Sequence, residues 1–233
     1  LSSLKLVVER PLIFKVQVNG QLLKSEEGSW WLDKSMAVFP LSQLARIGLN
    51  TVTLIVKPFD LLAELEPIYI LGDFSLEEAT RGFILSPAKK LEPGSWKKQG
   101  LPLYGHRVEY QTNFKLSDTE LAASGFSLSL PDWQGALAEV LINGESAGFI
   151  IGQYDCLLLG SKLKTGLNQI SVIIYGTLKN TLGPHHLNPP AGQAWPGSFQ
   201  RAPEGGQPTG SEYNVRDYGL SGEIILSSRK NKK

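Results

Sequence analysis

The stretch "EVLINGESAG" (Glu139–Gly148), followed by "TGLNQISVII" (Thr165–Ile174), decides the fold of this chain. Both pieces contain runs in which apolar residues alternate with other residues, as is typical of β-strands that bury one face. The Asn143-Gly144 pair fits a two-residue hairpin, because a type I′ turn needs positive φ at both central residues. The pattern therefore predicts a strand, a tight hairpin, a second strand, a turn and a third strand.

The same order of signals occurs earlier, in "FKVQVNGQLL" (Phe14–Leu23) and "GLNTVTLIV" (Gly48–Val56). Asn19 and Asn50 are 31 positions apart and Asn143 and Asn168 are 25 apart, so the first copy carries six extra residues. A long pattern that occurs twice indicates two related domains and not a solenoid. We expect the strand at Gln169–Tyr175 to correspond to the strand at Thr51–Lys57.

Short apolar runs separated by Gly, Pro, Asn and Asp continue along the chain and predict an all-β protein of the sandwich or barrel type. We expect less than a tenth of the chain to be helical, with a single turn at Pro40–Gly48. The polar stretch Ser86–Pro102 contains three prolines and no periodicity. The expected organisation is a first domain at 1–90, a linker at 91–103, a second domain at 104–228 and a basic tail at 229–233.

Composition and charge exclude several classes of protein. A chain with 42% hydrophobic and 19% charged residues is globular, and its net charge of +1 argues against a nucleic-acid footprint. The basic run Arg229–Lys233 is expected to be a solvated tail. No apolar run is long enough for a transmembrane helix. Cys156 is the single cysteine, so an internal disulfide is excluded, and its apolar neighbours predict a buried thiol.

Four longer stretches resemble the galactose-binding-like jelly-roll accessory domains of large glycoside hydrolases. They are "YGHRVEYQTNFKL", "EVLINGESAGFI", "LKTGLNQISVIIYGTLKNTLGPHH" and "YGLSGEIIL", within Tyr104–Ser227. Such domains occur in the β-galactosidase clan and in α-L-rhamnosidase-like enzymes. The resemblance implies two galactose-binding-like jelly-roll β-sandwiches. The first sandwich lacks the opening strand of the family, so it is expected to be incomplete at its N-terminus.

The resemblance implies a non-catalytic accessory region of a larger glycoside hydrolase. Its partners would be the catalytic domain of the same parent chain and an oligo- or polysaccharide, in a secreted or periplasmic location. An autonomous carbohydrate-binding module and a purely structural domain pair without ligand remain alternatives. A catalytic barrel needs about 250 residues by itself, so none fits beside the strands of this chain. Glu64 and Glu66 are the nearest to a carboxylate pair, and we expect them to be solvated or in ion pairs.

Candidate site residues are two adjacent histidines and several tryptophans. His185 and His186 open a long Gly- and Pro-rich stretch; neighbours on an extended chain point opposite ways, which argues against a shared metal. We expect one ring to bond loop backbone and the other to face the surface, with Trp195 close by. Trp30, Trp31 and Trp133 are candidate platforms for a sugar ring, with domain packing as the alternative. No cofactor is expected, although a structural Ca²⁺ held by backbone carbonyls would leave no sequence signature.

Overall fold

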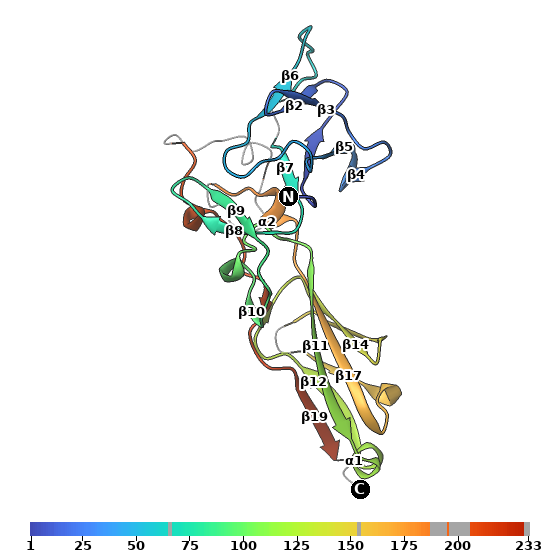
Figure 1. The fold of residues 1–233 in the computed structure, drawn as a ribbon. Helices are drawn as coiled ribbons and strands as arrows, with labels where there is room; N and C mark the ends of the chain where they lie inside the picture. Colours follow the sequence, from blue (N-terminus) through green and yellow to red (C-terminus); the bar gives the residue numbers. More distant parts are fainter. Residues whose placement is uncertain (65–66, 153–154, 187–194, 196–205, 231–233) are drawn as a thin grey trace. The chain divides into compact units, whose positions relative to one another are not determined.

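The computed structural model describes residues 1–64, 67–152, 155–186, 195 and 206–230. Strands make up 43% of it and helices 9%, which confirms the all-β prediction and the expected helix content. The chain divides into two compact units, Leu1–Phe74 and Ser75–Lys233, which we call the first unit and the second unit. Figure 1 shows both units as strands and loops, with only short helices.

The first unit is a small sandwich of two sheets. Its strands are β1 (Lys5–Glu9), β2 (Lys15–Val18), β3 (Gln21–Leu23), β4 (Trp30–Trp31), β5 (Asp33–Pro40), β6 (Val52–Ile55) and β7 (Tyr69–Leu71). One sheet has the order β4-β5-β1-β7 and the other the order β3-β2-β6. Leu6 and Val8 of β1 share a buried cluster with Val16 and Val18 of β2, so the core lies between the two sheets.

The second unit contains a larger sandwich. Its strands are β8 (Phe74–Glu78), β9 (Phe83–Pro87), β10 (Gly94–Ser95), β11 (Arg107–Leu116), β12 (Ser124–Ser129), β13 (Trp133–Gln134), β14 (Leu137–Ile142), β15 (Glu145–Ile150), β16 (Cys156–Leu158), β17 (Gly166–Tyr175), β18 (Gly219–Leu220) and β19 (Ile225–Lys230). The two main sheets have the orders β11-β17-β14-β15 and β16-β12-β19. Leu128 of β12 and Val172 of β17 belong to one buried cluster between them.

Short helices and two further small sheets complete the second unit. The helices are η1 (Lys97–Gln99), α1 (Asp118–Ala123), η2 (Gly160–Lys162), α2 (Lys179–Leu182) and η3 (Gly210–Glu212). The small sheets are the β8-β9 pair and β10-β18-β13. Helix α1 begins with a capping box, in which Ser117 and Glu120 bond each other's backbone N–H groups.

The two units repeat one strand order. In the first unit β1 lies between β5 and β7, and in the second unit β12 lies between β16 and β19. Likewise β2 lies between β3 and β6, whereas β14 lies between β15 and β17. Strands β1, β2, β3, β5, β6 and β7 therefore correspond, in chain order, to β12, β14, β15, β16, β17 and β19. The expected correspondence of Thr51–Lys57 with Gln169–Tyr175 holds in this pairing of β6 with β17.

An asparagine pair joins the hairpin to the third strand in both units. Asn143 Nδ2 donates to Asn168 Oδ1 at 3.0 Å, and Gln169 N donates to Asn143 Oδ1 at 3.1 Å. In the first unit Asn19 Nδ2 donates to Asn50 Oδ1, also at 3.0 Å. Thr51 N donates to Asn19 Oδ1, as Gln169 N does to Asn143 Oδ1 in the second unit. Asn143 and Asn19 both have positive φ, as the predicted hairpins require. The shared network explains why Asn-Gly and Gly-Leu-Asn recur at these positions.

The chain divides into compact units at Phe74–Ser75, and Trp96, within the expected linker at 91–103, is buried in the core of the second unit. Two local expectations differ from the structure. Cys156 is exposed and not buried, since the three-residue strand β16 is the edge of its sheet. Arg229 and Lys230, expected in the tail, pair with β12 as the end of β19.

Candidate functional site

The segment after β17 forms a tight corner around Asn180. Helix α2 ends at Leu182 and is followed by Gly183, whose φ of +92° suits glycine, and by Pro184. His185 Nε2 lies 2.7 Å from the backbone oxygen of Asn180, so this nitrogen carries the proton and donates. One ring of the histidine pair therefore bonds the backbone of its own corner.

Asn180 also fixes a distant segment of the chain. Its side chain is buried and bonds both backbone groups of Arg216: Nδ2 donates to the carbonyl at 2.8 Å and Oδ1 accepts from the amide at 2.7 Å. Lys179 Nζ donates to the carbonyl of Asn214 at 2.5 Å and to that of Pro184 at 2.7 Å. The corner thus holds the backbone of residues 214–216 in place.

Tyr213 packs against both histidines. Its ring centroid lies 5.6 Å from that of His185 and 4.8 Å from that of His186, which approaches edge-on. Phe83 contacts the same tyrosine at 5.0 Å, and the Gln207 amide donates to its hydroxyl group. His186 is partly exposed, so it packs on an aromatic neighbour while retaining a surface position.

Burial governs the charge of this corner. It lowers the pKa of His185 below the ordinary 6.5, against the opposing effect of the bond to Asn180. It also lowers the pKa of His186. The pKa of Lys179 is lowered as well, by burial and then by the charge of Arg216. Since its pKa lies below 6.5, His185 is neutral at pH 7.

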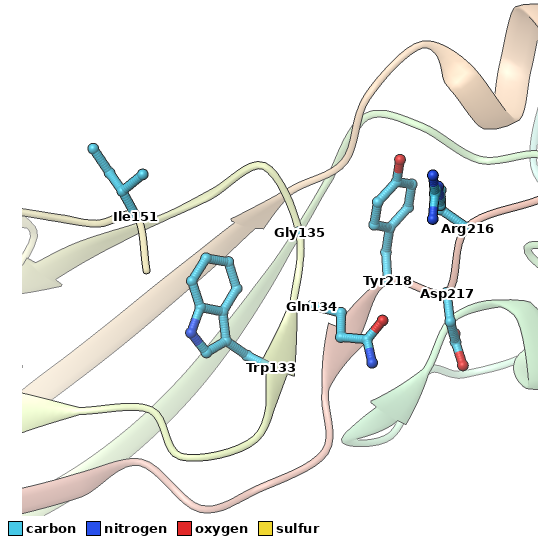
Figure 2. Close-up of a pocket in the computed structure, with 7 residues that line it drawn as sticks. All are labelled: Trp133, Gln134, Gly135, Ile151, Arg216, Asp217 and Tyr218. Carbon is cyan, nitrogen blue, oxygen red and sulfur yellow. The ribbon is translucent and has the colours of Figure 1, made fainter. Parts of the chain in front are cut away.

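Residues 214–216, which the corner holds in place, lead into Asp217 and Tyr218. Together with Arg216 these two residues line one wall of a pocket of about 310 Å³. Figure 2 shows Trp133 and Ile151 on one side and Arg216, Asp217 and Tyr218 on the other, with Gln134 between them. Strand β13 supplies the first wall and pairs with β18, which follows Tyr218 in the chain. The pocket therefore combines an aromatic and aliphatic side with charged and amide groups.

Hydrogen bonds fix two side chains of the polar wall, whereas the indole of Trp133 on the opposite wall makes none among the described residues. Ser95 Oγ lies 2.5 Å from Asp217 Oδ1, and the Tyr218 hydroxyl lies 2.6 Å from Thr177 Oγ1. Trp133 is 2% exposed, and its indole N–H has no partner among the described residues. Buried donors are nearly always paired, so this unpaired N–H is an exception within the buried part of Trp133.

The remaining sequence-predicted tryptophans lie elsewhere. Trp30 is 53% exposed in β4, whereas Trp31 is half-buried and packs on Tyr69 with ring centroids 5.0 Å apart. Trp195 is also exposed, but residues 187–194 and 196–205 on either side of it lie outside the described chain. The structure thus brings His185 and His186 together around Tyr213, and it places Trp133 in the pocket that Arg216 also lines.

Other site chemistry is sparse in the described chain. It contains no group of three His, Cys, Asp or Glu side chains that could hold a metal ion. Glu64 pairs with Arg10 at 3.2 Å, and Glu66 lies outside the described residues. None of the described helices has the length and apolar character needed to span a membrane.

Sequence reasoning did not single out most of the pocket. Gln134, Ile151, Arg216, Asp217 and Tyr218 come from three separate stretches, and only Tyr218 lies in one of the stretches that carry the resemblance. One local signal was Trp133 in "LPDWQG", at a turn. A second signal was Asn180 in "LKNTLGP", because an asparagine near a chain reversal often bonds backbone.

Comparison with known proteins gives no family for this chain. No protein-family model and no curated protein matches it. Among solved structures it is similar to the β-glucuronidase from Ruminococcus gnavus in complex with D-glucuronic acid. That match has 18% identity and a TM-score of 0.30, and it covers 41% of this chain and 17% of that one. It is also similar to the Bifidobacterium dentium β-glucuronidase complexed with coumarin-3-O-glucuronide. Here the identity is 17% and the TM-score 0.39, with 66% of this chain and 29% of that one covered.

Both neighbours are glycoside hydrolases, and this chain spans less than a third of either one. TM-scores this low assign neither a fold nor a function to the chain. Any proposal about the activity, ligand or partners of this chain therefore rests on the geometry of its own residues.

Proposed function

We propose that this chain is a non-catalytic accessory region of a larger glycoside hydrolase, and that its second unit contacts glycan at the Trp133 pocket. The observation that carries the proposal is the meeting of an apolar wall with three different hydrogen-bonding side chains. Sugar rings present apolar C–H faces and many hydroxyl groups, so they need both kinds of surface. The catalytic domain of the parent chain is the proposed partner, in a secreted or periplasmic location.

The chemistry of the pocket suits hydroxyl groups. Asp217 accepts hydrogen bonds, Arg216 donates them, and the Gln134 amide does both. Hydroxyl groups act as donor and acceptor, so each of these side chains has a complementary partner on a sugar. The volume of about 310 Å³ lies at the lower end for small-molecule sites, which favours one or two sugar residues and not a long chain.

Arg216 allows a clean test because its two roles are separable. Its backbone groups make the bonds to Asn180, while its side chain lines the pocket. We expect Arg216→Ala to keep the corner intact and to weaken glycan binding at least tenfold, as about 1.4 kcal/mol per lost charged hydrogen bond would give. Gln134→Ala should weaken binding as well.

The measurement is calorimetric titration of the chain with a panel of neutral and acidic mono- and oligosaccharides. Trp30→Ala is the matched control, because it removes an exposed tryptophan from the first unit. Saturable binding that Arg216→Ala weakens and Trp30→Ala leaves unchanged supports the pocket. Absence of binding to every sugar would contradict glycan contact and would favour the purely structural pair.

Trp30 favours a second candidate, the autonomous carbohydrate-binding module. Its indole is 53% exposed, and a solvent-open ring is the platform on which such modules stack a sugar. In that case Trp30→Ala abolishes retention of the chain on insoluble polysaccharide, while Arg216→Ala leaves it unchanged. The same two variants therefore separate the two candidates.

A further inference from the structure

The correspondence of the two units leaves one strand of the second unit without a counterpart. Strand β17 lies between β14 and β11, which pairs with it along ten residues. Its counterpart β6 pairs with β2 on one side, and in the described chain no strand lies on its other side. Among the described strands, β11 is the one member of the two main sheets of the second unit without a counterpart in the first unit, and β4 is the one strand of the first unit without a counterpart in those sheets.

The free edge of β6 presents unpaired backbone groups in a known register. Asn19 N donates to Thr51 O at 2.8 Å, so Thr53 and Ile55 also face β2 in the antiparallel ladder. The backbone groups of Val52 and Leu54 then point away from β2. Their counterparts, Ile170 and Val172, point toward β11 in the same way.

The core-facing side chains of β6 are also less buried than those of β17. Ile170 and Val172 are fully buried, and Val108 and Tyr110 of β11 pack against their cluster. Val52 and Leu54 face the core of the first unit but are only partly buried. An added strand with apolar residues at alternate positions would cover them, as β11 covers β17.

The turn before β6 is uncovered too. In the second unit Thr165 precedes β17, and its hydroxyl donates to Asp118 Oδ1 at 2.6 Å, in the connection that follows β11. The corresponding residue before β6 is Ile47, which is 94% exposed. Among the described residues, the first unit therefore has a counterpart neither of β11 nor of the connection that follows β11.

We propose that the free edge of β6 is an acceptor site for an antiparallel strand, and that its occupant is an extended segment on the N-terminal side of β1 in the longer protein. The order of the second unit indicates this source, because β11 comes directly before β12, the counterpart of β1. The occupant has apolar residues at alternate positions, facing Val52 and Leu54. This inference rests on the proposed function only in taking the chain as a region of a longer protein.

The test compares three chains by amide hydrogen exchange and by the melting temperature of the first unit. The first is the present chain, and the second carries the natural upstream residues. The third carries a copy of residues 107–119 before Leu1, which leaves the same seven-residue connection that separates β11 from β12. Neither measurement depends on glycan binding, so the result stands whether or not the second unit binds glycan.

We expect the natural extension to slow exchange of the Val52 and Leu54 amides at least tenfold and to raise the melting temperature of the first unit. The copy should do the same, and Tyr110→Pro within the copy alone should cancel its effect, since proline removes a ladder donor. If only the copy protects these amides, the acceptor exists but its occupant is not the upstream segment, and the proposal is overturned. It is also overturned if neither extension protects them, or if the present chain protects them in a concentration-dependent way by pairing with a second copy.

Discussion

The first and second units share a scaffold and differ in what is added to it. Both build a sandwich from six corresponding strands and tie the hairpin to the third strand with an asparagine pair. The second unit adds β11 at the edge of one sheet and a long excursion between β17 and β19. The corner at Asn180 and the pocket wall at 216–218 lie in that excursion.

The difference separates what stabilises the fold from what forms the candidate site. The asparagines of the repeat bond within the scaffold in both units. In the first unit only thirteen residues, 56–68, separate β6 from β7, and those that the structure describes form no counterpart of the corner or of the pocket wall. Function is therefore expected to differ between the units although the strand order is the same.

The largest expected effect comes from removing a buried side chain next to β11. Ile170→Ala should lower the free energy of unfolding of the second unit by about 2–5 kcal/mol, because Ile170 is 2% exposed between covered strands. Val52→Ala, at the corresponding place in the first unit, should cost less than half as much, since Val52 is only partly buried. Urea unfolding followed by unit-resolved NMR signals checks this, and equal losses would mean that β6 is as well covered as β17.

A smaller effect is expected from the asparagine network. Asn168 is fully buried, and its side chain bonds Lys164, Gly166 and Asn143. Asn168→Ala leaves buried backbone groups unpaired and should cost the second unit about 1–3 kcal/mol. Asn50→Ala should cost the first unit less, because Asn50 is exposed and water can reach the groups that it leaves. Thermal unfolding of both variants gives the comparison, and a larger loss for Asn50→Ala would contradict it.

The smallest expected effect is a pH dependence confined to the second unit. All three histidines lie there, and burial lowers the pKa of His185 below 6.5. The unfolded chain then binds a proton more readily than the folded chain, so stability is complete above about pH 6.5 and falls as the pH drops below that value. Melting temperatures of the two units between pH 7.5 and about pH 5 test this.

His186→Ala is the control for that measurement. It should keep most of the pH dependence, because His186 is less buried than His185 and burial is what lowers both pKa values. An equal decline of both units over this range would assign the effect to groups other than the histidines.

Local signals in the sequence predicted much of the scaffold. Asn-Gly and Gly-Leu-Asn occur at fixed places because each positions a backbone turn, so the repeat and its strands were readable. Helix α1 was missed although Ser117 and Glu120 form a capping box, since the surrounding pattern is that of strands. Cys156 was predicted to be buried because it precedes leucines. It is exposed in the edge strand β16, and apolar neighbours in the sequence do not show that a strand lies at the edge of its sheet.

The candidate site was less predictable because its parts are distant in sequence. Trp133 and Arg216 are brought together by the pairing of β13 with β18 and by the bonds from Asn180, and neither depends on a local pattern. The histidines were identified as a corner, and His185 bonds backbone as expected. The contact of this corner with a catalytic domain stays a prediction.

Site-resolved amide exchange of the present chain distinguishes an uncovered β6 from one that is already paired. If both units share one strand order and β6 has no neighbour among the described residues where β17 has β11, exchange should be slow at Ile170 and Val172 and fast at Val52 and Leu54. Thr53, whose amide faces β2, should exchange at an intermediate rate. Protection at Val52 and Leu54 equal to that at Thr53, at every protein concentration, would show that the edge of β6 is already paired and that the proposed acceptor site does not exist.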